Sequence, residues 1–286
     1  MFVGCWSGVY GRFGARVETK GASQYMLRWM SPQKAGEELE REKQVAARAA
    51  LWWVRSGMTL GLGTGSTARY FILLLGERVR AGELTIGAVA SSTASENTAR
   101  EAGITLVEAK RGLRLDLTVD GADEIAPDLD LIKGAGGALL REKVLAQGAQ
   151  YFVVMGDSSK RVARLGSIPL PVEVVPFTLP WVMDRVQALG ADPVLRTRAG
   201  GDVFLTDQRN YILDCHFQKI ESPRTLATRL KEIPGVVEHG IFLHDSISDH
   251  AQAAVVAEGS EAVVLRPGVP PVRFEEFTAL EKDRDG

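Results

Sequence analysis

The sequence predicts an α/β protein, because short apolar runs alternate with glycine- or hydroxyl-rich turns and helical segments. Five apolar runs have the length and composition of strands: 58–62, 86–90, 105–108, 115–119 and 151–155. Most are followed by a polar turn and then by a helical segment. Repeated strand–helix units of this kind build a mostly parallel sheet with helices on both faces.

The first helix is predicted from Ser31 and Pro32 to about Arg55. Its apolar residues recur at helical spacing, and the pair Trp52 and Trp53 is expected in the core. Further helices are expected to begin near Ser66 and to span 96–102 and 138–147.

A second domain is predicted from residue 168, where the pattern changes. Strand and helix signals follow in the order β-α-β-β-α-β over 168–241, which resembles a small ferredoxin-like α+β module. The proline-containing segment 168–176 is typical of an edge strand or a hinge.

The chain then returns to the first domain with strands near 253–257 and 261–265, and the charged end is expected to be frayed. We therefore expect an extension (1–33), a sheet domain (34–167 with 242–270), an α+β lid and oligomerisation domain (168–241) and a tail (271–286).

Composition excludes several classes of protein. The 286 residues have a net charge of −2, which gives no overall attraction to nucleic acid or to an anionic membrane, and no apolar run reaches the roughly 20 residues of a membrane span. Cys5 and Cys215 form no disulfide framework, which fits a reducing, cytoplasmic compartment. The four histidines show neither HxH nor HExxH, so we expect no metal site.

The first thirty residues are rich in glycine, aromatic residues and arginine, with Glu18 as the only acid. We expect a poorly ordered extension, or translation starting at Met30. A targeting segment is the alternative, since transit peptides are arginine-rich and poor in acids.

The segment 61–68 reads GLGTGSTA, a strand end, a glycine turn and the start of a helix. Bare glycine backbone, hydroxyl side chains and a helix N-terminus together favour a phosphate-binding loop. Because GxGxxG is matched only in part and no P-loop lysine follows, a dinucleotide turn and a purely structural turn stay open.

The segment 116–143 gathers acids, lysines and glycines in one short stretch. Asp120 and Asp123 could cap turns, hold a divalent ion or bind sugar hydroxyls. Lys133 could be a surface lysine or could stabilise an oxyanion, and Glu142 could be a solvated helix acid or a base. A carboxylate that moves a proton between adjacent carbons, beside a cation, permits aldose–ketose isomerisation, although composition does not select that reaction.

Five motifs, in order and at matching spacing, resemble the ribose-5-phosphate isomerase type A family over about 37–265. They are GLGTGSTA, VDGADEI, LIKGAGGALLREK, DSSK followed by LG and PLPVEV, and IPGVV. The resemblance implies a Rossmann-like domain with an α+β lid, a homodimer or homotetramer, and no metal or organic cofactor. It also implies the conversion of ribose 5-phosphate to ribulose 5-phosphate through an enediolate, in the pentose phosphate pathway.

The resemblance also implies roles for individual residues. Glu142 would be the base that moves a proton between C1 and C2, and Lys133 would stabilise the enediolate. Asp120 and Asp123 would serve ring opening and hydroxyl binding. The implied substrate-binding residues are Lys43, Thr64, Gly65, Ser66, Thr67, Gly121, Ala122, Gly134, Ala135, Gly136 and Lys160.

The sequence departs from the family at Ala135, since it reads KGAG where KGGG is usual. If this residue needs a positive φ, alanine would strain the loop; otherwise it is harmless.

Three other functions compete with the isomerase. A coenzyme A transferase would use Glu142 as a nucleophile, and a sugar-phosphate deaminase would also need a TGST-like loop. A sugar-phosphate-sensing regulator would need a DNA-binding element, and the N-terminal segment shows no helix-turn-helix pattern.

Overall fold

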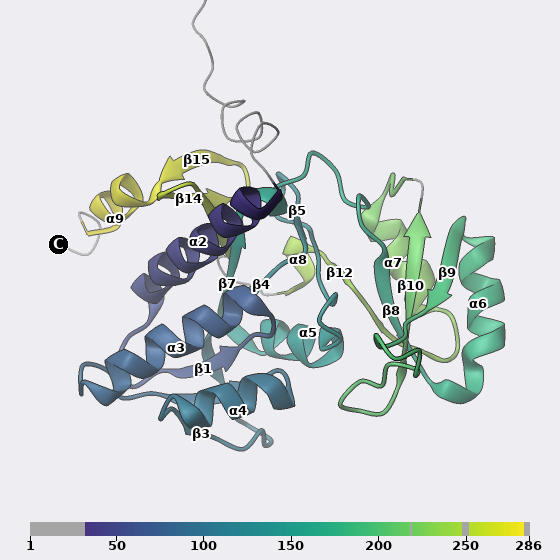
Figure 1. Ribbon diagram of the computed structural model, residues 1–286, viewed down its shortest axis with the longest axis horizontal. Helices are drawn as coiled ribbons and strands as arrows, with labels where there is room; N and C mark the ends of the chain where they lie inside the picture. Colours follow the sequence, from purple (N-terminus) through teal and green to yellow (C-terminus); the bar gives the residue numbers. More distant parts are fainter. Residues whose placement is uncertain (1–31, 218, 248–251, 283–286) are drawn as a thin grey trace, which may run out of the picture.

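The computed structural model describes residues 32–217, 219–247 and 252–282 (Figure 1). The expectations for the first thirty residues lie outside these ranges. None of the helices within them is long and apolar enough to cross a membrane.

An eight-stranded sheet forms the larger part of the molecule, in the order β15-β14-β13-β7-β4-β1-β2-β3. The strands from β3 to β13 in this order pair in parallel, and β14 and β15 add an antiparallel edge. This arrangement confirms the predicted mostly parallel sheet. The strands are β1 (Thr59–Leu62), β2 (Gly87–Ala90), β3 (Thr105–Leu106), β4 (Leu115–Gly121), β7 (Ala149–Asp157), β13 (Gln252–Glu258), β14 (Glu261–Arg266) and β15 (Val269–Arg273).

Helices cover both faces of this sheet. The side chains of β4 show this, because they point alternately to one face and to the other. Val119 lies in the main core, to which α2 (Pro32–Ala50) and α3 (Ser66–Arg80) contribute. The next residue back, Thr118, donates its hydroxyl hydrogen to Leu145 O of α5 (Leu139–Gln147) at 2.9 Å. Because successive side chains of a strand point to opposite faces, α5 lies opposite α3.

Helix α4 (Thr93–Glu101) begins three residues earlier than predicted. Its serines and threonine suggested a loop, but Ser92 is the N-cap and its hydroxyl accepts from Ser95 N–H at 3.1 Å. Hydroxyl side chains satisfy backbone N–H groups at helix starts, so a polar run there marks a helix rather than a loop.

A three-stranded sheet that the sequence analysis did not anticipate lies between the two larger parts. It has the order β12-β6-β5, with β5 (Glu124–Ile125), β6 (Leu131–Ile132) and β12 (Ile241–Phe242). Strands of two residues carry too little periodicity to be recognised in a sequence. This sheet joins the DGADE turn to the chain that returns from the second domain.

The second domain is a four-stranded antiparallel sheet in the order β11-β8-β10-β9. In chain order this is fourth–first–third–second, so the predicted ferredoxin-like order is confirmed. Its elements are β8 (Leu170–Val174), α6 (Leu179–Ala188), β9 (Ala191–Leu195), β10 (Tyr211–Phe217), α7 (Pro223–Lys231) and β11 (Val236–His239). Short helices complete the fold: η2 (Leu51–Trp53), η3 (Ser158–Lys160), η4 (Pro176–Thr178) and α8 (His244–Ile247).

The prediction that 168–176 is an edge strand or hinge was wrong, because β8 pairs on both sides and is fully buried. Two of its prolines, Pro169 and Pro176, fall outside the strand. Pro171 stands near the first residue of the strand, where it uses only its carbonyl, which accepts from Gly240 N–H at 2.8 Å. Proline is tolerated at such a position because no donor is needed.

The expected frayed tail was also wrong. Strand β15 pairs with β14, and α9 (Phe274–Lys282) follows it. Phe277 is buried, with its ring centroid 5.1 Å from that of Trp52 and 5.4 Å from that of Trp53. The many charges of this segment lie around two phenylalanines three residues apart, which are enough to dock one helical face.

Replacing Phe277 by alanine should therefore lower the free energy of unfolding by about 3 kcal/mol, the usual cost of deleting a buried phenyl ring. Urea unfolding followed by tryptophan fluorescence would measure it. Leu280→Ala on the same helix is the control, since Leu280 is half exposed and should cost about 0.5 kcal/mol or less. Equal effects of the two substitutions would mean that α9 is not packed on the tryptophans.

Candidate active site

A cavity of about 110 Å³ opens where the loops after β1 and β4 meet the loop before α5. All of its lining residues belong to the set predicted from the sequence: Lys43, Thr64, Gly65, Ser66, Thr67, Gly121, Ala122, Asp123, Lys133, Gly134, Gly136, Glu142 and Lys160. Of the remaining predicted residues, Asp120 contacts Lys133 from within the core, and Ala135 is exposed on the neighbouring loop. The structure thus brings together residues from five separate stretches of the chain.

One wall of the cavity is the glycine loop that starts α3. Gly65 is the N-cap of the helix with φ 112°, an angle that favours glycine. Gly63 is needed for a different reason, because a Cβ there would stand 1.9 Å from Oδ1 of Asp120. The N–H groups of the first turn, at Ser66 and Thr67, have no partner within the helix and can bind an anion.

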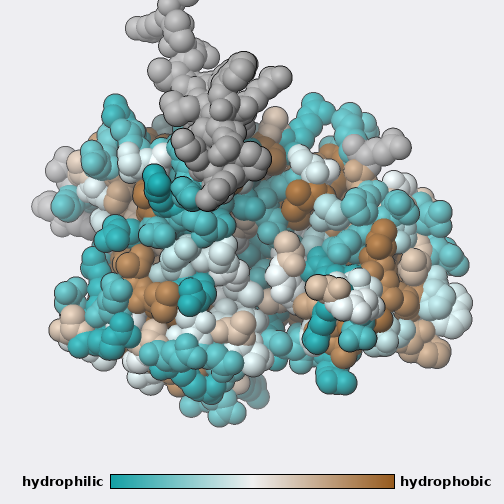
Figure 2. Space-filling view, in the orientation of Figure 1, coloured by the Kyte–Doolittle hydropathy of each residue, from teal (hydrophilic) through white to brown (hydrophobic). Residues whose placement is uncertain are grey.

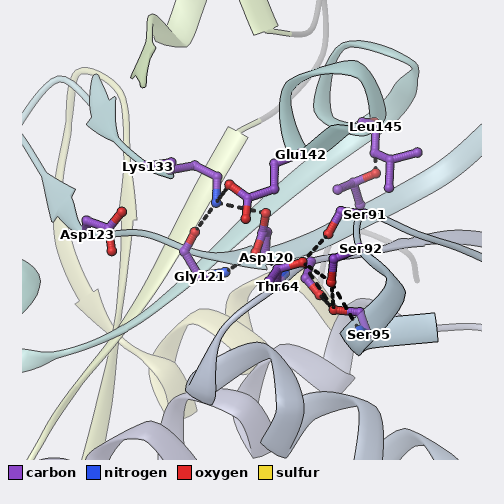
Figure 3. A network of polar contacts seen from close by, with 12 residues as sticks. Thr64, Ser91, Ser92, Ser95, Asp120, Gly121, Asp123, Lys133, Glu142 and Leu145 are labelled. Atoms are coloured by element: carbon purple, nitrogen blue, oxygen red, sulfur yellow. Dashed lines mark hydrogen bonds and ion pairs between the residues drawn. The ribbon is translucent and has the colours of Figure 1, made fainter. Parts of the chain in front are cut away.

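The hydroxyl of Thr64 takes part in a serine cluster rather than facing the cavity freely (Figure 3). Thr64 Oγ1 lies 2.7 Å from Ser91 Oγ, 2.8 Å from Ser92 Oγ and 3.1 Å from Ser95 Oγ. Ser95 in turn donates to Gly63 O at 2.6 Å. The hydroxyl side chains at 91–95, where α4 begins, therefore hold the glycine loop in place.

Lys133 lies between two buried carboxylates (Figure 3). Its Nζ is 2.8 Å from Asp120 Oδ2 and 3.2 Å from Glu142 Oε2, and it donates to Gly121 O at 2.6 Å. All three charged side chains are at most 3 % exposed. The alternatives of a surface lysine and a solvated helix acid are thereby excluded.

One ammonium facing two buried carboxylates leaves a net negative charge out of water. Burial, partly offset by Lys133, raises the pKa of Glu142 to about 8, and burial also raises the pKa of Asp120. Burial alone would lower the pKa of Lys133, but Asp120 and Glu142 together raise it above its ordinary value.

Asp120 and Glu142 differ in the hydrogen bonds that the surrounding protein donates to them. Asp120 Oδ1 accepts the backbone N–H groups of Thr64 at 3.0 Å and Gly121 at 2.7 Å, and these bonds favour its ionised form. Glu142 stands beside Lys133 and the open cavity. Glu142 is therefore the group placed to gain and lose a proton near neutral pH.

The loop 133–137 carries the substitution of alanine for the usual middle glycine. The positive φ angles of this loop fall on glycines, 103° at Gly134 and 81° at Gly137, whereas the only non-glycine residues with positive φ in the described ranges are Leu129 and Arg209. Ala135 therefore adopts an ordinary angle, and its N–H donates to Asp123 Oδ2 at 2.9 Å. Alanine at this position is harmless.

Two lysines close the other side of the cavity. Lys43 of α2 has a side chain that is 17 % exposed and pairs with Glu40. Lys160 ends η3, which is held by a residue that the sequence analysis missed. Buried Glu42 accepts from Ser158 N–H at 2.8 Å and from Gly259 N–H at 2.7 Å.

Replacing Glu142 by glutamine should stabilise the protein at pH 8. Because the folded-state pKa of Glu142 lies above the ordinary 4.5, its contribution to stability is complete below pH 4.5 and is lost as pH rises to about 8. Over that range the wild type should lose up to about 1.4 kcal/mol per pH unit relative to Glu142→Gln. Thermal unfolding at pH 5 and pH 8 measures the difference; a variant less stable than wild type at pH 8 would contradict the assignment.

Known proteins are similar to this chain over most of its length. The family model described as ribose 5-phosphate isomerase A (phosphoriboisomerase A) matches residues 87–259. Ribose-5-phosphate isomerase A of Sphingopyxis alaskensis is 48 % identical over 227 residues, which are 79 % of this chain and 96 % of the relative. The protein of the same name from Roseiflexus castenholzii is 50 % identical over 77 % of this chain and 92 % of its own.

Solved structures show the same fold. The structure of ribose 5-phosphate isomerase A from Methanocaldococcus jannaschii has a TM-score of 0.74 and 36 % identity, covering 79 % of this chain and 99 % of that one. A D-ribose-5-phosphate isomerase in complex with phospho-erythronic acid has a TM-score of 0.75 and 36 % identity, covering 80 % and 99 %. The chain belongs to the ribose 5-phosphate isomerase A family.

Proposed function

We propose that this protein interconverts D-ribose 5-phosphate and D-ribulose 5-phosphate in the non-oxidative pentose phosphate pathway, without a metal or an organic cofactor. One observation carries the proposal. A carboxyl with a pKa of about 8 and a buried ammonium share a small cavity with an anion-binding helix start. These groups are what an enediolate mechanism requires, and the family membership supports the same substrate.

The phosphate would bind at the start of α3. The free N–H groups of the first turn and the hydroxyls of Ser66 and Thr67 offer donors there, and Lys43 and Lys160 add positive charge. The sugar would then extend from the glycine loop toward Asp123 and Lys133. This orientation places the two reacting carbons near Glu142.

In the proposed reaction the Glu142 carboxylate removes the proton from C2 of the open-chain aldose. The electron pair forms the C1–C2 double bond, and the carbonyl oxygen at C1 becomes an enediolate oxygen that the Lys133 ammonium stabilises. Glu142 returns the proton to C1, and the proton of the C2 hydroxyl passes to the oxygen on C1, so that C2 becomes the ketone and C1 carries the hydroxyl. The atoms and electrons balance within the substrate, so no oxidant or reductant is needed.

Asp120 and Asp123 have different proposed roles. Asp120 is fully buried and bonded to Lys133, so it would hold that ammonium in place and keep it charged. Asp123 lines the cavity and accepts Ala135 N–H with Oδ2, which leaves Oδ1 to bind a sugar hydroxyl and to assist ring opening.

We also propose that residues 168–241 act as a lid and oligomerisation domain of a cytoplasmic homodimer or homotetramer. Exposed apolar side chains on this domain support self-association: Phe177 is 79 % exposed and Trp181 60 %. Figure 2 shows hydrophobic residues, in brown, at the surface of the second domain on the right of the view. Light scattering of the purified protein would measure the oligomeric state.

Substitutions should separate chemistry from binding. Glu142→Gln should lower kcat by about 10³-fold with little change in KM, because a base acts mainly in the transition state. Lys160→Ala should instead raise KM and the inhibition constant of inorganic phosphate, with a smaller effect on kcat. Ribulose 5-phosphate formation from ribose 5-phosphate, measured in EDTA, provides both constants.

Wild-type turnover in EDTA is the reference for both variants. Near-normal kcat in Glu142→Gln would rule out this residue as the base. A folded wild-type protein that forms no ribulose 5-phosphate would remove the isomerase proposal. Covalent labelling of Glu142 by an acyl-CoA would then point to the transferase.

A further inference from the structure

A side chain from the second domain reaches the loop that precedes the catalytic helix. Arg196 directly follows β9, and its Nη1 donates to Gly134 O at 3.1 Å and to Ala135 O at 2.9 Å. Its other donors are used by Asp214, to which Nε donates at 2.9 Å and Nη2 donates as well. The guanidinium is therefore held in a fixed plane by one carboxylate while it binds two consecutive carbonyls.

The bonds to the peptide between Gly134 and Ala135 run in opposite directions. Its carbonyl accepts from Arg196, and its N–H donates to Asp123 Oδ2 at 2.9 Å. Because a trans peptide is planar, with C=O and N–H on opposite sides, Arg196 and Asp123 hold the two ends of one rigid unit. Rotation of this peptide would break both contacts.

The next peptide contacts Arg196 through its carbonyl. Its carbonyl, Ala135 O, points at Arg196, so the N–H of Gly136 points away from Arg196. Gly136 lines the cavity together with Gly134 and Asp123. Gly134 O also accepts from Gly137 N–H at 2.9 Å. The orientation of these two peptides is therefore set by this turn together with one side chain of the second domain.

A ring contact supports the same loop. The guanidinium carbon of Arg196 is 5.8 Å from the ring centroid of Phe204, and a Cβ on Gly137 would stand 2.4 Å from Cζ of that ring. Gly137 also has φ 81°. Arg196, Phe204 and the loop thus pack as one unit directly before α5, the helix that carries Glu142.

We infer that Arg196 is a positioning residue for the isomerase reaction. It acts through the peptides at 134–136, because the Ala135 N–H holds Asp123 and the Gly136 N–H is turned toward the sugar end of the substrate. The inference rests on the proposed function. It assigns to the second domain a part in organising the reacting end of the cavity, and the phosphate end lies on other elements.

The test compares Arg196→Met, which keeps most of the stem but removes every donor, with Arg198→Met. Arg198 is exposed and lies 5.9 Å from the same Phe204 ring, and no contact between its guanidinium and the loop is seen in the described structure. The readouts are kcat and KM for ribose 5-phosphate and the inhibition constants of inorganic phosphate and phospho-erythronic acid. The carboxylate of the latter resembles an enediolate and, in the proposed orientation of the substrate, would lie at the loop end of the site.

Arg196→Met should lower kcat by about 10- to 100-fold, which is the usual effect of a small displacement of reacting groups. It should raise the inhibition constant of phospho-erythronic acid about tenfold and leave that of inorganic phosphate unchanged. Arg196→Lys keeps the charge, but one ammonium can replace only some of the hydrogen bonds of the guanidinium. Its kcat and its inhibition constant for phospho-erythronic acid should therefore lie between those of the wild type and those of Arg196→Met. If Arg196→Met fails to fold, the comparison with Arg198→Met uses Arg196→Lys instead.

Two results would overturn the inference. One is a folded Arg196→Met or Arg196→Lys protein that is less heat-stable but keeps the wild-type kcat and the wild-type inhibition constant of phospho-erythronic acid. That result would mean that Arg196 has a purely structural role. The other is an equal loss in Arg198→Met. If the wild type and Arg198→Met are both inactive, the proposed function itself is wrong. If both are active and Arg196→Met is as active as they are, the proposed function stands and only the inference about Arg196 is wrong.

Discussion

The structure of the site depends on one buried ammonium that two carboxylates share. Lys133 contacts Asp120 and Glu142 where each side chain is at most 3 % exposed. A pair of opposite charges would leave the site neutral, whereas two carboxylates around one lysine leave an excess negative charge that burial penalises. Burial raises the pKa of both carboxyls, but Asp120 also accepts two backbone N–H groups, which favour its ionised form, whereas Glu142 lines the open cavity. Proton exchange by Glu142 near neutral pH follows from this arrangement.

The fold holds Lys133 from several directions. Its backbone N–H donates to Gly240 O at 2.9 Å, in the chain that returns from the second domain, and its ammonium lies 5.4 Å from the ring centroid of Phe242. Lys143 of α5 lies 4.6 Å from the same ring and donates to Glu238 of β11 at 2.8 Å. The small sheet and the second domain therefore contribute to the geometry of the site as much as the parallel sheet does.

Most of the fold could be predicted because the repeated strand–helix pattern is local in the sequence, and nearly all of the cavity residues could be named because their motifs resemble those of a known family. Glu142 was identified by its motif, but its burial and shifted pKa depend on Asp120 and Lys133 and could not be read from α5. Pro171 misled because the tolerance of a strand for proline depends on its exact position. Arg196 and Glu42 were missed since each acts on loops distant in sequence, and the docking of α9 rests on two phenylalanines among many charges.

The central claim is that Glu142 keeps a proton to about pH 8 because it shares Lys133 with Asp120. Carbon NMR of protein labelled at the glutamate carboxyls, titrated from pH 4 to pH 10, tests it most directly, with Glu142→Gln to assign the resonance. One carboxyl should titrate near pH 8 in the wild type and be missing from the variant. If the Glu142 carboxyl titrates below about pH 6, as ordinary glutamates do, the account of the shared ammonium is wrong.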